Sequence, residues 1–232
     1  MNRNFPPLYA ILSAEPLSFR SAEYAAEFAV MLAKAGVGII QYRNKNATAR
    51  TLLKVCTRIS HTLSAFTTSA GISVRFIVND RADIARLSGA SGVHVGQDDL
   101  PVDEARAVSQ KIIPQSDRAE SAEDFWIGVS THTLEQVRIA AATSADYIAI
   151  GPIFATTTKQ NHEAIVGTDF IRQARQLTNK PLVAIGGITV TTAEEVFRAG
   201  ADSIAVARDL VSAPDPTARA AEYLAMAETF RN

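Results

Sequence analysis

The sequence predicts a single-domain (β/α)8 barrel, the TIM-barrel fold, because three features of the 232-residue chain agree. Short apolar runs alternate with helical patterns along the whole chain. The runs are almost continuously apolar, which is typical of parallel strands that helices cover on both faces. The length fits one barrel of this kind. An open doubly wound sheet shares the alternation, but no glycine-rich dinucleotide turn follows the first run.

The elements follow from where apolar runs, caps and glycines fall. Eight strands are expected over 8–12, 37–43, 74–78, 93–96, 125–129, 147–151, 182–185 and 203–207. Helices are expected over 21–34, 48–63, 84–87, 101–110, 133–142, 169–177, 192–199 and 218–230. Two segments fit no element. Residues 1–7 form a proline-rich start that we expect to be loose, and 111–124 is a polar stretch that we expect to be an exposed insertion.

Composition excludes several classes of protein. A net charge of −1 argues against a general nucleic-acid or anionic-membrane surface. No apolar run is long enough to span a bilayer, and the start of the chain lacks the pattern of an export signal. The lone Cys56 lies in a helical pattern as a small buried hydrophobe, which fits a reducing compartment. We therefore expect a cytoplasmic protein; the oligomeric state is left open, a homo-oligomer included.

Two neighbouring strands are each followed by a carboxylate. Asp80 follows the strand over 74–78, and Asp99 follows the strand over 93–96. Because parallel neighbours in a βαβ unit end at the same edge, we expect these side chains to converge. Such a pair suits Mg²⁺, which keeps some waters and takes other ligands from a phosphate. The alternative for Asp80 is a helix N-cap. For Asp99 that alternative is weaker, because Pro101 would be the first helical residue.

The second strand ends in a run of polar residues. If the strand continues, Gln41, Arg43 and Lys45 alternate onto one face. Two cations and an amide on one face form a clamp for a polyanion, and arginine adds bidentate geometry. The alternative is a solvated rim with surface ion pairs.

Later strand ends carry hydroxyls, a histidine and a lysine. Ser130 and His132 follow the fifth strand, where Ser130 is a candidate phosphate donor and His132 fits a structural role better than a general base. The long connection over 152–166, typical of functional loops, contains Thr156–Thr158 and Lys159. These groups suit an oxyanion. A Schiff base on Lys159 is the alternative, but no apolar strand surrounds it to lower its pKa.

The last two strands end in small residues and a cation. Gly186-Gly187 follows the seventh strand and leaves backbone N–H groups open to a ligand, and Ala207-Arg208 follows the eighth. Loops at these places often form the phosphate site of this fold. The sequence therefore predicts two anion sites, one beside the metal and one at strands seven and eight. A pyrophosphate ester and a monophosphate would fill both.

With these residues the chain resembles the thiamine phosphate synthase family. The matching motifs keep the family's order over 41–208, and six in order are specific although each alone is weak. They are Gln41-Tyr42-Arg43-Asn44-Lys45, Val78-Asn79-Asp80, Gly92-Val93-His94-Val95-Gly96-Gln97-Asp98-Asp99, Gly128-Val129-Ser130-Thr131-His132, Gly151-Pro152-Ile153-Phe154 with Thr156, Thr158 and Lys159, and Ile185-Gly186-Gly187-Ile188.

The resemblance implies a transferase of thiamine biosynthesis. It would join hydroxymethylpyrimidine diphosphate to hydroxyethylthiazole phosphate, or to its carboxylated form, and release pyrophosphate. Mg²⁺ would be held by Asp80 and Asp99. The catalytic residues implied are Arg43, Lys45, Ser130 and Lys159. The substrate-binding residues implied are Gln41, Tyr42, Arg43, Asn44, Lys45, Asn79, Ser130, Thr156, Thr157, Thr158, Lys159, Gly187, Ala207 and Arg208.

Two departures from the family pattern and two rival functions accompany this resemblance. Asn44 stands where the family commonly has an acidic residue and is expected to face away from the lumen. Arg208 stands where a small residue is usual, so the thiazole-phosphate contacts are the least defined. One rival is the sister family of thiazole tautomerases, which generally carries histidine at the position of Ser130. The other is a non-catalytic phosphate-sensing barrel.

Overall fold

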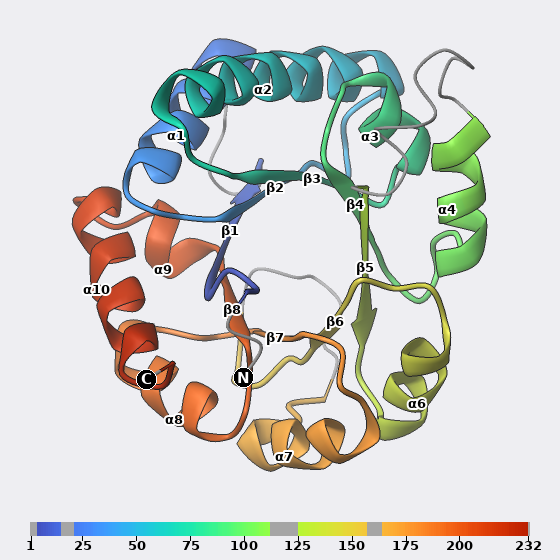
Figure 1. Ribbon diagram of the computed structural model, residues 1–232, viewed down its shortest axis with the longest axis vertical. Coiled ribbons are helices and arrows are strands. Elements are labelled where there is room, and N and C mark those ends of the chain that lie inside the picture. Colours follow the sequence, from blue (N-terminus) through green and yellow to red (C-terminus); the bar gives the residue numbers. More distant parts are fainter. Residues whose placement is uncertain (1–3, 15–20, 112–124, 157–163, 232) are drawn as a thin grey trace.

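The computed structural model describes residues 4–14, 21–111, 125–156 and 164–231. Within these residues eight strands close into a barrel in the order β1-β2-β3-β4-β5-β6-β7-β8. Every neighbouring pair is parallel, including β1 with β8, and the helices form a ring around the strands (Figure 1). The predicted single-domain (β/α)8 barrel is confirmed.

The strands lie within two residues of the bounds expected from the sequence. They are β1 Leu8–Ser13, β2 Ile39–Arg43, β3 Arg75–Asn79, β4 Gly92–Val95, β5 Trp126–Thr131, β6 Tyr147–Ile150, β7 Leu182–Ile185 and β8 Ser203–Val206. The apolar runs located them well because both faces of each strand are buried, so the run and the strand nearly coincide.

The helices agree in place but differ at some ends. They are α1 Ala22–Lys34, α2 Ala49–Ala70, α3 Ala82–Leu87, α4 Val102–Lys111, α6 Leu134–Ala142, α7 Gly167–Leu177, α8 Val190–Arg198, α9 Arg208–Val211 and α10 Pro216–Glu228. The second helix was expected to end at Leu63, whereas α2 continues to a left-handed C-cap at Gly71. Its last turns lack buried apolar residues, so the apolar period stops before the helix does. The short α9 was not expected.

Alternation along the strands divides the core into two parts. Side chains on one face of each strand pack outward against the helices, as Val78 and Val93 do. Side chains on the other face fill the lumen, among them Ile39, Ile77 and Val183. Cys56 is a buried free thiol on α2 in the outer layer, as its sequence context indicated.

The start of the chain is more ordered than expected. Phe5 is 4% exposed and its ring stacks on Trp126 with centroids 5.3 Å apart, closing the lumen at the amino ends of the strands. The expectation that residues 1–7 are loose is therefore wrong for Phe5, because the aromatic contact outweighs the proline-rich context. The expected exposed insertion over 111–124 lies outside the described residues, apart from Lys111 at the end of α4.

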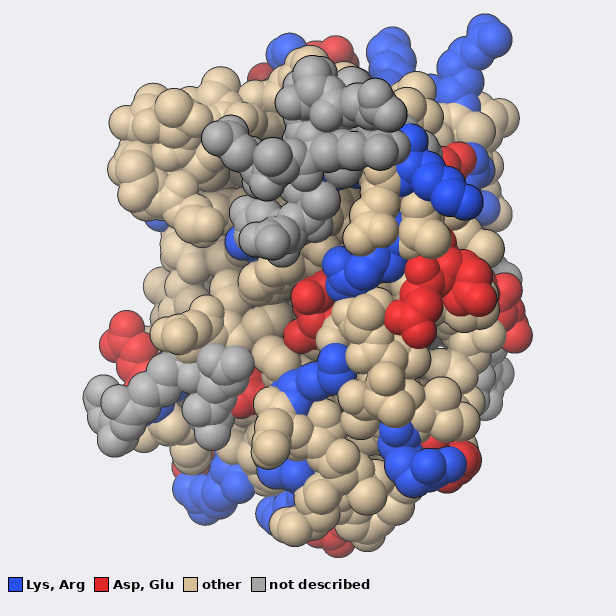
Figure 2. Space-filling view, turned by 45° about the vertical axis from the view of Figure 1, so that its right-hand side comes forward, with Lys and Arg blue, Asp and Glu red and all other residues tan. Residues whose placement is uncertain are grey.

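Surface charge is mixed on the face that Figure 2 shows, where basic and acidic side chains are interspersed. Among the residues that the structure describes, no helix combines the length and apolar character needed to cross a membrane.

Candidate active site

The carboxylates of Asp80 and Asp99 converge at the mouth of the barrel, which we define as the end where the strands have their carboxyl termini. The two side chains lie within hydrogen-bonding reach of each other. Asp99 Oδ2 also accepts a hydrogen bond from the backbone N–H of Gly96 at 2.7 Å. Asp80 does not cap α3, because that helix has Arg81 at its N-cap position without a side-chain cap. The expected convergence is observed, and capping does not explain Asp80.

Electrostatics at this pair favour a bound cation. Burial, the hydrogen-bonding contact with Asp99 and the charge of Asp99 raise the pKa of Asp80 to about 6. Lys45 opposes the shift, since its Nζ lies 3.5 Å from Asp80 Oδ2. Two like charges this close are unfavourable unless a proton or a cation lies between them.

The backbone at Asp80 is also unusual. It has φ 65°, the only positive φ of a non-glycine residue among those the structure describes. Its N–H donates to the carbonyl of His94 at 2.8 Å, which ties the end of β3 to β4. A left-handed residue at a strand end stores some backbone strain, and such strain is concentrated at functional sites.

The donor set fits Mg²⁺ better than a metal with a complete protein cage. Within the described part of the chain, no group of three or more His, Cys, Asp or Glu side chains is arranged to hold a metal. A pair of carboxylates leaves most coordination positions to water and phosphate oxygens, which is the usual arrangement for Mg²⁺.

The end of β2 brings the predicted anion clamp to the same place. Gln41 is buried in the lumen and its Nε2 donates to the hydroxyl of Tyr9 at 2.7 Å. Alternation therefore directs Arg43 toward the lumen side as well. Tyr42 and Asn44 face the other way, because Tyr42 belongs to the outer core and Asn44 donates to its hydroxyl. Register turns these two side chains from the lumen, which argues against the expectation that they bind substrate.

The ends of β3 and β5 add polar groups to the mouth. Asn79 pairs with His94 across β3 and β4, so its side chain lies on the lumen face. Ser130 is buried, with its Oγ 2.8 Å from His94 Nε2, and its carbonyl accepts from Gln97 Nε2 at 2.6 Å. His132 donates from Nδ1 to the carbonyl of Gly151 at 2.6 Å, which supports the structural role given to it.

The second predicted anion site, at the ends of β6 to β8, lies only partly within the described residues. Gly187 has φ 64°, and a Cβ there would lie 2.4 Å from the carbonyl oxygen of Ala155, so glycine is required. Thr156 follows Ala155 in the sequence and is described, whereas residues 157–159, including the predicted Lys159, lie outside the described residues. Ala207 is the N-cap of α9, and Arg208 is its exposed first residue.

Several polar residues in the lumen were not predicted. Tyr9, Tyr147 and His94 hydrogen-bond beneath Gln41 and Ser130. Ser13 ends β1 beside Arg43, and its buried hydroxyl has no hydrogen-bond partner among the described residues. In the sequence, the only sign of these residues is a polar side-chain atom at a strand position that faces the lumen. Apolar runs are recognised without regard to such atoms.

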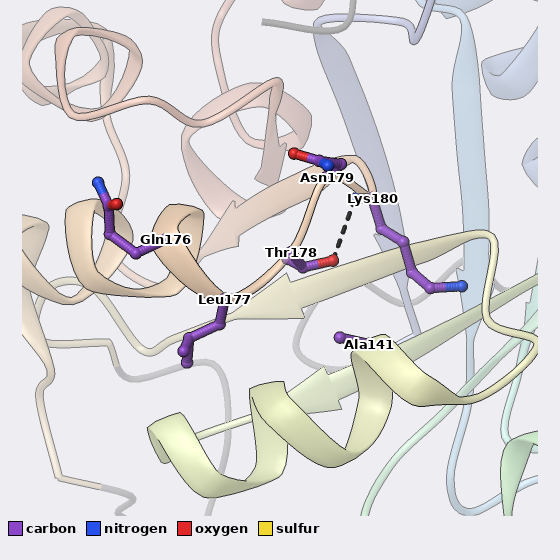
Figure 3. A pocket seen from close by; sticks show the side chains of 6 residues that line it. All are labelled: Ala141, Gln176, Leu177, Thr178, Asn179 and Lys180. Atoms are coloured by element: carbon purple, nitrogen blue, oxygen red, sulfur yellow. Dashed lines mark hydrogen bonds between the residues drawn. The ribbon is translucent and has the colours of Figure 1, made fainter.

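A surface hollow of about 580 Å³ lies elsewhere, lined by Ala141, Gln176, Leu177, Thr178, Asn179 and Lys180 (Figure 3). It borders α6 and α7 near the amino end of β7, opposite the mouth. Lys180 Nζ donates hydrogen bonds there to the carbonyls of Thr143 and Ala145, at 2.9 and 2.6 Å. None of the predicted site residues lines this hollow.

A closed parallel barrel with paired carboxylates and cations at the carboxyl ends of its strands is typical of a TIM-barrel enzyme. Comparison with known proteins gives the family. Residues 8–210 match the thiamine monophosphate synthase family, and the chain belongs to it.

Individual relatives agree with this assignment. A thiamine-phosphate synthase of Koribacter versatilis is 43% identical over 220 residues, covering 94% of each chain. One of Chloroflexus aurantiacus is 40% identical over 219 residues, covering 94% of this chain and 91% of the relative. Among solved structures, the thiamine phosphate pyrophosphorylase of Pyrococcus furiosus is 27% identical with a TM-score of 0.79, covering 98% of each chain.

Proposed function

We propose that this thiamine-phosphate synthase joins hydroxymethylpyrimidine diphosphate to hydroxyethylthiazole phosphate by Mg²⁺-assisted loss of pyrophosphate. The observation that carries the proposal is the convergence of Asp80, Asp99 and Lys45 at one mouth. The anion clamp at the end of β2 and the carboxylate pair lie side by side. This arrangement suits a diphosphate bound through a divalent ion. The second substrate is the thiazole phosphate or its carboxylated form.

The diphosphate would bind between β2 and β5. Arg43 at the end of β2 and Lys45 just after it supply positive charge, and Ser130 supplies a hydroxyl from β5. Asn79 adds an amide from the end of β3. Lys159 completes this set in the family pattern. Asp80 and Asp99 would hold Mg²⁺, which when bound neutralises diphosphate charge and so makes pyrophosphate a better leaving group.

The proposed reaction needs no covalent bond between the protein and its substrates. The bond between the methylene carbon and the diphosphate oxygen breaks, and its electron pair leaves with pyrophosphate. The pyrimidine methyl cation that remains is stabilised by the ring amine, and the thiazole nitrogen forms the new bond to carbon. Arg43 and Lys45 stabilise the charge that develops on the leaving group. The barrel orients both partners and excludes water, so no protein nucleophile is needed.

The monophosphate of the thiazole would bind across the ends of β6 to β8. Gly187 packs there against the carbonyl of Ala155, where no Cβ fits, so the loop after β7 lies directly on the loop after β6. Thr156, Thr157 and Thr158 would donate hydroxyls, and the backbone at Ala207-Arg208 would close the site. The exposed Arg208 side chain would add a cation at its edge.

A product assay tests the proposal. Purified protein is incubated with both phosphorylated substrates and Mg²⁺, and thiamine phosphate and pyrophosphate are measured together. Equal amounts of the two products are expected, and none when either substrate is omitted. Isomerisation of the carboxylated thiazole phosphate without condensation would instead support a tautomerase. Binding of substrates without any turnover would support a phosphate-sensing barrel.

A further inference from the structure

Five side chains form a continuous hydrogen-bonded chain through the barrel, which we call the lumen network. The network is Gln41, Tyr9, Tyr147, His94 and Ser130, contributed by β2, β1, β6, β4 and β5. Gln41 Nε2 donates to the Tyr9 hydroxyl at 2.7 Å, and the two tyrosine hydroxyls lie 3.0 Å apart. His94 Nδ1 lies 3.2 Å from the hydroxyl of Tyr147, and His94 Nε2 lies 2.8 Å from Ser130 Oγ.

The network is closed off from solvent. Its side chains range from 0% exposed for Tyr147 to 8% for His94. The ring of His94 also stacks on that of Tyr147, with centroids 5.7 Å apart. Space for the tyrosine ring depends on Gly128, since a Cβ there would lie 2.0 Å from Tyr147 Cζ. The arrangement is therefore built into the packing of the lumen.

The hydrogen bonds have one consistent direction. The hydroxyl of Tyr9 accepts from Gln41, so its own proton is available for Tyr147. The proton of Tyr147 is then available for Nδ1 of His94. A neutral imidazole whose Nδ1 accepts carries its proton on Nε2. His94 therefore donates to Ser130, and the serine proton is left to point to a ligand.

Both phenols keep the protons that this direction requires. Burial raises the pKa of Tyr9 and of Tyr147 well above the ordinary value of 10. Each hydroxyl therefore remains a donor and an acceptor near neutral pH. In a buried site every such group needs a partner, so reversing one bond would leave another polar atom unsatisfied.

The two ends of the network present opposite hydrogen-bonding groups. Gln41 uses one N–H of its amide for Tyr9, and its carbonyl oxygen is an acceptor left for a ligand. Ser130 accepts from His94 and presents its hydroxyl hydrogen, a donor. An aminopyrimidine carries N–H donors, and a diphosphate carries only acceptors. The ends thus match the two halves of one pyrimidine diphosphate.

We propose that His94 and Tyr147 are positioning residues that fix Ser130 as a donor to the diphosphate and Gln41 as an acceptor from the aminopyrimidine. This inference rests on the proposed function and adds to it the residues that set polarity in the pyrimidine site. His94 acts through Ser130 and holds the Nε2–H tautomer.

Variants of His94 with different hydrogen-bonding atoms test the proposal. His94→Asn keeps an acceptor near the place of Nδ1 but has no donor near the place of Nε2, whereas His94→Gln can bring an amide N–H to Ser130. We expect kcat/KM for the pyrimidine diphosphate to fall about tenfold or more in His94→Asn and to recover in His94→Gln. The KM for the thiazole phosphate should not change. A Tyr147→Phe variant removes one hydroxyl of the lumen network. Tyr24→Phe, on the exposed face of α1, is its matched control for the loss of a tyrosine hydroxyl.

A double-mutant comparison separates positioning from general packing. In a Ser130→Ala background, His94→Asn should cause little further loss, because the group through which it acts is gone. Additive losses would overturn the positioning role. Equal KM increases for both substrates would also overturn it, since they would indicate a distorted barrel.

A second measurement covers variants that fail to fold. Nitrogen NMR of His94 in the wild-type protein should show a protonated Nε2 and an unprotonated Nδ1. The opposite tautomer would overturn the proposed direction. Absence of turnover by the wild type would instead remove the proposed function, and the NMR result would still decide the direction of the network.

Discussion

Replacing Asp80 by asparagine should stabilise the metal-free protein while removing its function. Burial and Asp99 raise the pKa of Asp80 from 3.8 to about 6. A shift of that size corresponds to about 3 kcal/mol, because one pKa unit is about 1.4 kcal/mol. Asparagine removes the like charge and tolerates the left-handed φ of 65°. We expect the free energy of unfolding to rise by about 1–3 kcal/mol at pH 8 in EDTA.

The sign of the pH dependence follows from the direction of the shift. The folded-state pKa lies above the unfolded value, so the folded protein binds the extra proton as pH falls through about 6. The destabilisation is complete above that pH, is relieved as the pH falls toward 3.8, and is absent below it. The advantage of Asp80→Asn should therefore be largest at pH 8 and should shrink at pH 5.

Denaturant unfolding of three proteins at both pH values measures this effect. Asp98→Asn is the matched control, because Asp98 is an exposed carboxylate one residue from Asp99 and should leave stability unchanged. Added Mg²⁺ should stabilise the wild type and the control but not Asp80→Asn. The reasoning is refuted if Asp80→Asn gains nothing at pH 8, or gains equally at both pH values.

Three further changes give separate expectations. Asp99→Asn should lower turnover by more than about 100-fold while the fold stays intact, and wild-type rates would remove the metal assignment. Gly128→Ala should cost about 1–3 kcal/mol of unfolding free energy by displacing the ring of Tyr147, and a variant as stable as wild type in denaturant would contradict the tight contact. Arg175→Ala should cost about 3 kcal/mol because it removes the ion pair at 2.8 Å with the buried Asp202, leaving the kinetic constants of the folded protein unchanged; altered KM values would show a link to the mouth.

The barrel could be predicted from sequence because its strands are buried on both faces. Apolar runs then mark strands directly, and parallel order follows from the helices between them. Helix ends were less predictable. The last fully buried apolar residue of α2 is Leu63, but the helix continues to Ala70 with only Phe66 of its last turns packed on the core. Phe5 was misjudged because its partner Trp126 is distant in sequence.

The site was predictable where strand ends carry charge. The convergence of Asp80 and Asp99 required only that β3 and β4 be neighbours. The lumen network required more, since Tyr9 and Tyr147 read as ordinary members of apolar runs. Their hydroxyls meet only because the barrel closes with both on the inward register. Closure of the barrel cannot be read from local sequence patterns.

The dependence of turnover on Mg²⁺ tests the central claim most directly. Initial rates of thiamine phosphate formation are measured over a titration of Mg²⁺ into metal-free wild type, Asp98→Asn and Asp99→Asn. Wild type and Asp98→Asn should be inactive without the ion and should saturate together, and Asp99→Asn should need far more Mg²⁺ or stay inactive. Full activity of the metal-free wild type, or identical titrations of all three proteins, would contradict the proposal that the carboxylate pair holds the ion that assists loss of pyrophosphate.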